Sequence, residues 1–234
     1  MDGAGSNSAG WSSPPPPIQP EASPLWPRHL IDIFIRPSRF FSSQLALGHT
    51  PYVLLVTWCF GIAQAMDRID INLMRSEFGR ARPGLHTLAG SWLYYWAFVL
   101  AAGLVAGCFL WLLGGWWYRV RLGWSGAVNP DAKNARLVYI YSSFVLAGPT
   151  VLWALIQTMT FPNYLAAWQS EEMWSALLLV FPFWSCYSSY RGATTLFTLK
   201  RGPARMWFLV LPAVVYFLVL GVLTALFAVF RPEG

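Results

Sequence analysis

The chain alternates between long uncharged runs and short clusters of charged residues. Five runs are rich in apolar side chains, and they cover residues 50–66, 87–118, 137–170, 173–190 and 206–230. They contain 17, 32, 34, 18 and 25 residues respectively. A helix of about 20 apolar residues crosses a hydrocarbon core about 30 Å thick. The pattern therefore predicts an all-α fold, a polytopic membrane bundle of five transmembrane helices.

The boundaries of the later spans follow from local signals. Aromatic rings near both ends of the second run predict a span at Trp92–Tyr118, because Trp and Tyr favour the two membrane interfaces. The third run divides into a span from Leu137 to about Met159 and a loop. The fourth span is expected to begin at Ser170, which can cap a helix that opens with two glutamates. Three prolines lie inside predicted spans: Pro149, Pro182 and Pro212. A membrane bundle can tolerate them, because neighbouring helices can satisfy the freed backbone carbonyls.

The first run is the shortest and leaves an alternative open. Thr50 can serve as its N-cap, and Pro51 suits the first helical position. Its 17 residues reach only about 26 Å as a helix. If this segment is a re-entrant hairpin, the chain crosses the membrane four times.

The composition excludes a soluble domain. Of 234 residues, 11% are charged and 56% are hydrophobic, whereas a soluble domain carries about 25% charged residues. Three cysteines are too few for a disulfide scaffold. The net charge of +6 is spread over short segments, which is not the basic face of a nucleic-acid-binding protein. The predicted partner is the lipid bilayer, with other membrane proteins or a homo-oligomer as open alternatives.

The distribution of basic residues predicts the orientation. Five spans with the N-terminus inside place 11 Lys and Arg residues in the cytoplasm and 5 outside. Because cytoplasmic loops carry the excess of basic residues, we expect an N-in, C-out protein of the cytoplasmic (inner) membrane. The four arginines between residues 67 and 82 oppose this orientation, since they would lie outside.

The chain divides into three parts on this reading. Residues 1–27 hold seven prolines among Gly and Ser, which predicts a disordered tail. Residues 28–50 carry apolar side chains at helical spacing, interrupted at Pro37, which predicts two short amphipathic helices at the inner membrane surface. Packing of these helices against the bundle or a partner is the alternative. Residues 51–230 form the five-span domain.

Residues that could carry chemistry are scarce in this sequence. The predicted spans contain no Asp, Glu, Lys, Arg or His, the residues that mark proton relays and ion paths in membranes. No catalytic or phosphate-binding motif occurs, so we expect no catalytic residue, no cofactor and no metal site. Asp67 and Asp70 could share a helix face and hold a divalent cation, but a solvated helix end explains them better. Small apolar roles are expected for Cys59, Cys108 and Cys186.

Two further patterns predict contacts. Small residues on one face of the second span would let another helix approach closely, within this chain or in a homodimer. These residues are Gly103, Gly107 and Gly114. A basic cluster just before the last span could bind anionic lipid head groups or could serve only as a topology signal. It consists of Lys200, Arg201 and Arg205.

The order of these parts resembles the YIP domain family, the Ypt/Rab-interacting proteins, and especially its bacterial branch. The matching features are the Pro-rich tail, the amphipathic element Ile33–Phe41, a short first span opened by Pro51, Arg191-Gly192 after the fourth span, and Pro212 early in the fifth. The resemblance implies five helices with N-in and C-out, as the charge count does. Eukaryotic members carry an Asp-Leu-Tyr-Gly-Pro type motif near the first span. This chain lacks it, so the family's link to Rab GTPases does not carry over.

The sequence thus favours a non-enzymatic, YIP-like membrane protein that organises membrane or scaffolds partners. The excess of Arg over Lys, 14 to 2, is expected of a GC-rich bacterial genome. A channel or permease subunit is the first alternative, because Ser, Thr and Asn in the proline-containing spans could line a path. A lipid-acting membrane enzyme is the second, with candidate groups only in the loop Asp67–Arg82.

Overall fold

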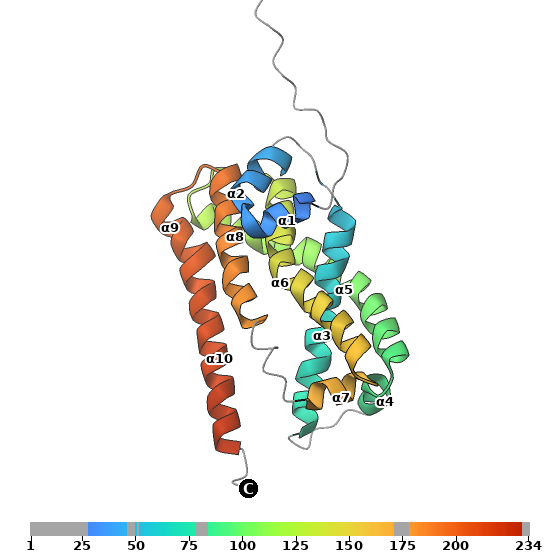
Figure 1. Ribbon diagram of the computed structural model, residues 1–234. Coiled ribbons are helices and arrows are strands. Elements are labelled where there is room, and N and C mark those ends of the chain that lie inside the picture. The colour runs from blue at the N-terminus through green and yellow to red at the C-terminus, as the bar shows by residue number, and fades with distance from the viewer. Residues whose placement is uncertain (1–27, 46–49, 51, 78–83, 171–177, 231–234) are drawn as a thin grey trace, which may run out of the picture.

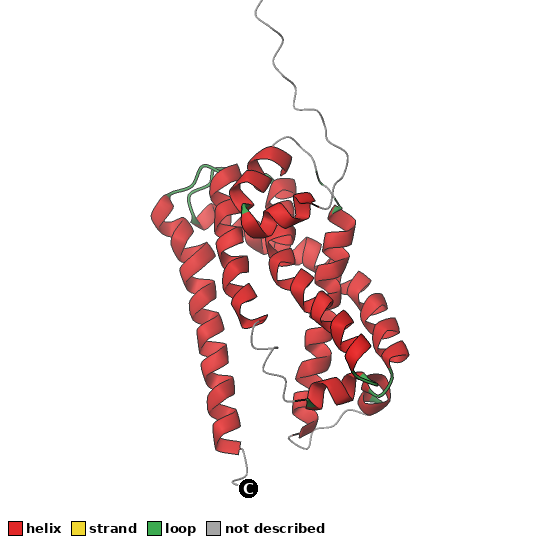
Figure 2. Cartoon of the chain, in the orientation of Figure 1, coloured by secondary structure: helices red, strands yellow, loops and turns green. Residues whose placement is uncertain are grey.

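The computed structural model describes residues 28–45, 50, 52–77, 84–170 and 178–230, and for 28, 29, 77 and 223–230 only the backbone (Figure 1). Within these ranges every regular element is a helix, which confirms the predicted all-α class (Figure 2). The proline-rich tail predicted at residues 1–27 lies outside the described residues.

In the described part of the chain, five long helices run roughly side by side along the bundle (Figure 1). They are α3 (Val53–Glu77), α5 (Trp92–Trp124), α6 (Ala132–Thr160), α8 (Val180–Leu196) and α10 (Leu211–Phe230). Helices α3, α5 and α6 pack on one another, α8 packs on α6, and α10 packs on α8. The short helix α9 (Arg201–Arg205) and the π-helical turn η3 (Met206–Val210) lead directly into α10.

Among the described residues, three helices are long and apolar enough to cross a membrane. They are α5, α6 and the continuous helix Arg201–Val222, which joins α9, η3 and the described part of α10. These coincide with the second, third and fifth predicted spans. For the fourth, α8 begins at Val180, and residues 171–177 lie outside the described residues. For the first, α3 is one continuous helix of 25 residues without the turn that a re-entrant hairpin needs.

Two helices extend well past the predicted ends of their membrane spans, for a common reason. Helix α3 continues past Met66 to Glu77, and α5 continues past Tyr118 to Trp124. Charged residues leave the hydrocarbon but do not break a helix; Gly and Pro in special conformations do. After α5, the chain turns at Gly126, whose φ is +93°.

The starts of two elements also differ from the prediction. Helix α3 begins at Val53, after Tyr52 with φ +54°, and not at Thr50. Ser170 ends α7 (Tyr164–Gln169), since its hydroxyl donates to the carbonyl of Ala167 at 2.7 Å. A predicted helix start at Ser170 would involve residues 171–177, which are outside the described residues.

The N-terminal segment forms short helices, as its spacing predicts. Helix α1 (Arg28–Ile35) is followed by α2 (Pro37–Phe40), with Pro37 at the first helical position, and by the π-helical turn η1 (Phe41–Leu45). Their apolar side chains are buried in one core with α6 and the last turns of α8, notably Ile33, Phe40, Phe41 and Leu45. This is the packing against the bundle that the sequence left as an alternative.

A second core lies at the opposite end of the bundle. There the last turns of α3 pack against α4 (Leu85–Ala89), α7 and the first turns of α5. Tyr95 is fully buried in it, and its ring stacks on that of Tyr164 with centroids 4.1 Å apart. The two cores lie at opposite ends of the bundle, one beside α1 and α2 and the other beside α4 and α7.

Candidate functional site

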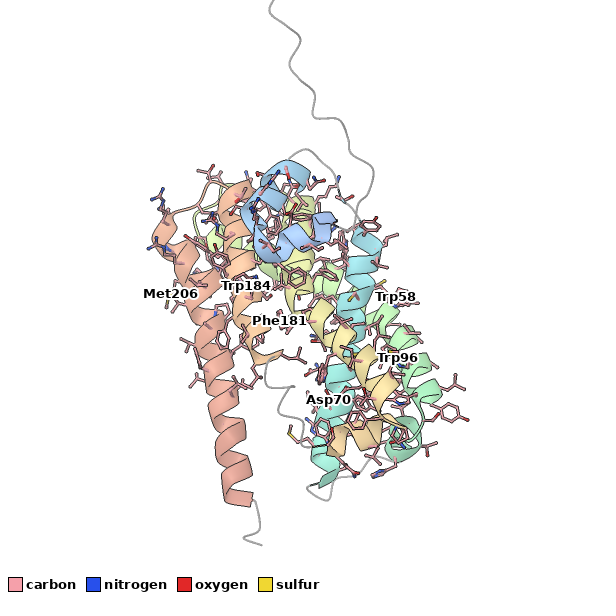
Figure 3. The ribbon with its side chains drawn as sticks, in the orientation of Figure 1. Trp58, Asp70, Trp96, Phe181, Trp184 and Met206 are labelled. Atoms are coloured by element: carbon pink, nitrogen blue, oxygen red, sulfur yellow. The ribbon has the colours of Figure 1, made fainter. Side chains whose placement is uncertain are left out.

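Exposed basic side chains gather at the end of the bundle where α1 and α2 lie (Figure 3). They come from α1 and α2, from both ends of the α5–α6 connection, and from the segment between α8 and α10. We call this set the cationic end: Arg36, Arg39, Arg119, Lys133, Arg191, Lys200, Arg201 and Arg205. The acidic side chains in these same elements are Asp32 and Asp131. This end therefore presents a strong excess of positive charge to an anionic surface.

The predicted lipid-contact residues Lys200, Arg201 and Arg205 are exposed and belong to this end. The backbone N–H of Lys200 donates to the carbonyl of Ser125 at 3.0 Å, which joins the loop before α9 to the loop after α5. The Lys200 stem also passes over Gly126, where a Cβ would lie 3.1 Å from Lys200 Cγ. The structure thus brings the cluster together with the basic residues of the α5–α6 connection.

The N-terminal helices are attached to α8 by side-chain hydrogen bonds. Trp184 Nε1 donates to the carbonyl of Phe34 at 2.8 Å, and Arg191 Nε donates to Ser38 Oγ at 2.6 Å. Gly192, one residue on, leaves room for an aromatic ring: a Cβ there would lie 2.8 Å from Phe41 Cε2. These contacts attach α1 and α2 to α8 at the cationic end. Ile31 and Ile35 of α1 remain exposed.

The glycines predicted for helix packing lie where α5 meets its neighbours. A Cβ on Gly103 would lie 2.9 Å from the backbone nitrogen of Ile62, and one on Gly107 would lie 2.9 Å from the carbonyl oxygen of Thr57, both on α3. Gly114 faces α6 instead, where a Cβ would lie 2.1 Å from the Tyr139 ring. The closest partner is Gly61 of α3, which the sequence reasoning missed although it lies in the first apolar run.

The far end of the bundle holds Asp70 in a polar cavity of about 240 Å³. Tyr164 donates its hydroxyl proton to Asp70 Oδ1 in a short hydrogen bond. Burial raises the pKa of the Asp70 carboxyl from 3.8 to about 7, the Tyr164 hydrogen bond opposes that rise, and Asp67 adds to it. Asp70 lies on the part of α3 beyond the predicted first span. It is labelled in Figure 3, beside α7.

Asp67 and Asp70 point to different surroundings in the described part of the chain. Asp67 is exposed, whereas Asp70 points into the cavity. Among the described residues, no group of three or more His, Cys, Asp or Glu side chains could hold a metal ion. Cys59, Cys108 and Cys186 lie on different helices, α3, α5 and α8, and are free thiols.

A second polar cavity, of about 250 Å³, lies inside the bundle near the cationic end. It is bounded by α3, α5, α6, α8 and α10 together with η3, and Arg121 is its one charged residue among the described residues that line it. Four serine hydroxyls and two tyrosines face the same space, contributed by Ser142, Ser143, Ser185, Ser189, Tyr139 and Tyr216. We call this space the Arg121 cavity. Arg121 lies beyond the predicted end of the second span at Tyr118, and it was not singled out from the sequence.

Arg121 is held by groups that do not neutralise its charge. Its Nη2 donates to the backbone carbonyl of Trp207 in a short hydrogen bond. Its guanidinium carbon lies 4.4 Å from the ring centroid of Phe208 and 5.8 Å from that of Tyr118. Carbonyl dipoles and aromatic faces stabilise a cation but leave its full charge in the cavity.

No known protein family, curated protein or solved structure matches this chain. The functional conclusion therefore rests on the geometry of the cationic end and the two cavities.

Proposed function

We propose that the chain is a non-enzymatic multipass protein of the cytoplasmic (inner) membrane of a bacterium, resembling the YIP family, that organises membrane or scaffolds partners through its cationic end. The observation that carries this proposal is the assembly of that end from separate parts of the chain. The α1–α2 segment, the α5–α6 connection and the α8–α9 connection all contribute exposed basic side chains there. Anionic inner-leaflet lipids attract such clusters by about 1 kcal/mol for each Lys or Arg near the surface.

The outer surface of the bundle supports a membrane location. Large apolar side chains along α3, α5 and α10 are exposed, for example Leu54 at 83% and Val105 at 73%. A soluble monomer rarely leaves apolar patches of that extent in water. We infer five crossings, by α3, α5, α6, α8 and α10, with the cationic end in the cytoplasm. A homo-oligomer or other membrane proteins are the expected partners, together with the bilayer.

The test is retention of anionic lipid by the purified protein. A variant with Lys200, Arg201 and Arg205 all changed to Gln should retain less phosphatidylglycerol than the wild type. A matched variant with Arg68→Gln and Arg75→Gln removes exposed charges from the far end and should retain wild-type amounts. Equal retention by all three proteins would contradict a lipid-binding cationic end. Proteins that co-purify in mild detergent would identify a scaffolded partner.

A channel or permease subunit is the second candidate, and a specific observation favours it. The Arg121 cavity is polar and lies between the helices instead of being filled by side chains. Solute flux into proteoliposomes that depends on the protein would support this candidate over the scaffold.

A further inference from the structure

The Arg121 cavity contains a charge that its own walls do not balance. Its described lining includes no Asp or Glu, and the groups nearest the guanidinium are a backbone carbonyl and aromatic rings. An ionised group away from bulk water is costly unless an opposite charge pairs with it. A cation held in this way is therefore a site prepared for an anion that the described part of the chain does not supply.

The shape of the guanidinium narrows the class of anion. Its planar set of N–H donors matches the paired oxygens of phosphate or carboxylate, and one carbonyl acceptor at Trp207 leaves other donors for a ligand. Hydroxyls of Ser143, Tyr139 and Tyr216 line the same cavity, and each has one proton that can be donated to a ligand oxygen. Ser185 donates to the carbonyl of Ser142 at 3.0 Å, which holds α8 against α6 at the cavity wall, and Ser142 donates within α6 to the carbonyl of Tyr139.

The position and size of the cavity fit a group at head-group depth. Arg121 lies one turn before the end of α5, beside the exposed basic residues of the cationic end. The volume of about 250 Å³ exceeds the roughly 30 Å³ that one water occupies in the liquid. Gln64 and Cys186 also line the cavity, and its remaining walls are apolar, formed by Phe60, Leu110, Leu146, Phe208 and Pro212. Such a space suits an oxyanion that is attached to an apolar body.

We propose that the Arg121 cavity binds a phosphate oxyanion, with Arg121 as its counter-ion and the surrounding hydroxyls as additional donors. The phosphate belongs either to an anionic phospholipid or to a free phosphate compound. This site is distinct from the exposed cluster at Lys200, Arg201 and Arg205, and it does not depend on the proposed scaffold role.

The experiment measures the thermal midpoint of the delipidated, full-length protein in non-ionic detergent at fixed ionic strength. Three probes are titrated: phosphatidylglycerol, phosphatidylcholine with the same acyl chains, and inorganic phosphate. Arg121→Gln should weaken the binding of the effective probe at least tenfold, and Arg121→Lys should weaken it less. The matched control is Arg68→Gln, an exposed arginine of α3 at the far end of the bundle, outside the cationic end, which should stay within twofold of the wild type.

Each arm of the titration has a defined meaning. An Arg121-dependent shift with phosphatidylglycerol but not phosphatidylcholine identifies lipid as the source, and one with inorganic phosphate identifies a free compound. The absence of any Arg121-dependent shift overturns the proposal. If Arg121→Gln does not fold, Ser143→Leu keeps the arginine and narrows the cavity from α6. That variant should also weaken binding at least tenfold, and wild-type affinity in it would overturn the proposal.

Discussion

Gly61 of α3 and Gly103 of α5 face each other where the backbones of the two helices come into close contact. A Cβ on Gly61 would lie 2.0 Å from the carbonyl oxygen of Gly103, a separation that no side chain could occupy. Backbones that approach this closely gain van der Waals contact along the whole crossing, which is how helices associate in lipid. Trp58 strengthens the same contact, since its Nε1 donates to the carbonyl of Leu100 at 3.0 Å.

Gly103→Ala should therefore destabilise the protein. The added methyl would meet the backbone of Ile62, which cannot move without separating α3 from α5. Overpacking of this kind costs about 1–3 kcal/mol. Thermal unfolding in detergent should show a lower midpoint than the wild type.

The matched control for this change is Gly123→Ala on the same helix. Nothing lies within 4 Å of a Cβ at Gly123, so alanine there adds helix propensity without a clash. Its midpoint should equal or exceed that of the wild type. Equal midpoints for the two variants would mean that the small-residue face has no packing role.

Gly192→Ala should loosen the N-terminal helices from α8. A Cβ at this position would lie 2.5 Å from Val138 Cγ1 and 2.8 Å from Phe41 Cε2, so the Phe41 ring must move out of the core. Amide hydrogen exchange across residues 28–45 should become faster, while exchange in α5 should change little. Gly202→Ala, where nothing lies within 4 Å, is the control and should leave exchange unchanged. Unchanged protection of residues 28–45 from amide exchange in Gly192→Ala would contradict the close packing of Phe41 against Gly192.

Asp70 should make stability depend on pH. Burial raises its pKa from 3.8 to about 7, so between these values the folded protein holds a proton that the unfolded chain releases. Stability should then fall as pH rises from about 4 to about 7, by at most about 1.4 kcal/mol per unit, and level off above that.

Asp70→Asn removes the titrating group and should flatten this dependence, as measured by thermal midpoints at pH 5 and pH 8. Asp131→Asn is a matched control at the N-cap of α6, where Asn caps as well as Asp, so the dependence should persist in it. A pH dependence that survives Asp70→Asn would assign the effect to another group.

The sequence predicts some elements of this bundle well because charge marks where a helix can enter lipid. The uncharged runs around α5, α6 and α10 could be located in this way. The helix ends could not be located in this way, because α3 continues past Asp67 and α5 continues past Arg119. The end of α5 depends on the positive φ of Gly126, which loop geometry decides.

The functional residues could be predicted from the sequence only in part. The cluster at Lys200, Arg201 and Arg205 is visible as a run of charge, but its neighbours come from distant segments that only the fold brings together. Arg121 had a usable signal: it lies seven residues after Gly114, which itself lies seven after Gly107. Extending that face by one heptad directs Arg121 into the bundle. No sequence signal indicated the burial of Asp70, because that burial depends on Tyr164, which lies 94 residues away in the chain.

We propose that the cationic end lies in the cytoplasm and that the chain crosses the membrane five times. Reporter fusions in a bacterial host measure this directly, with one reporter that is active only in the cytoplasm and one that is active only outside it. Fusions after residue 130 and after residue 200 should both report the cytoplasm, and a fusion at the C-terminus should report the outside. A cytoplasmic C-terminus would contradict the five-crossing account.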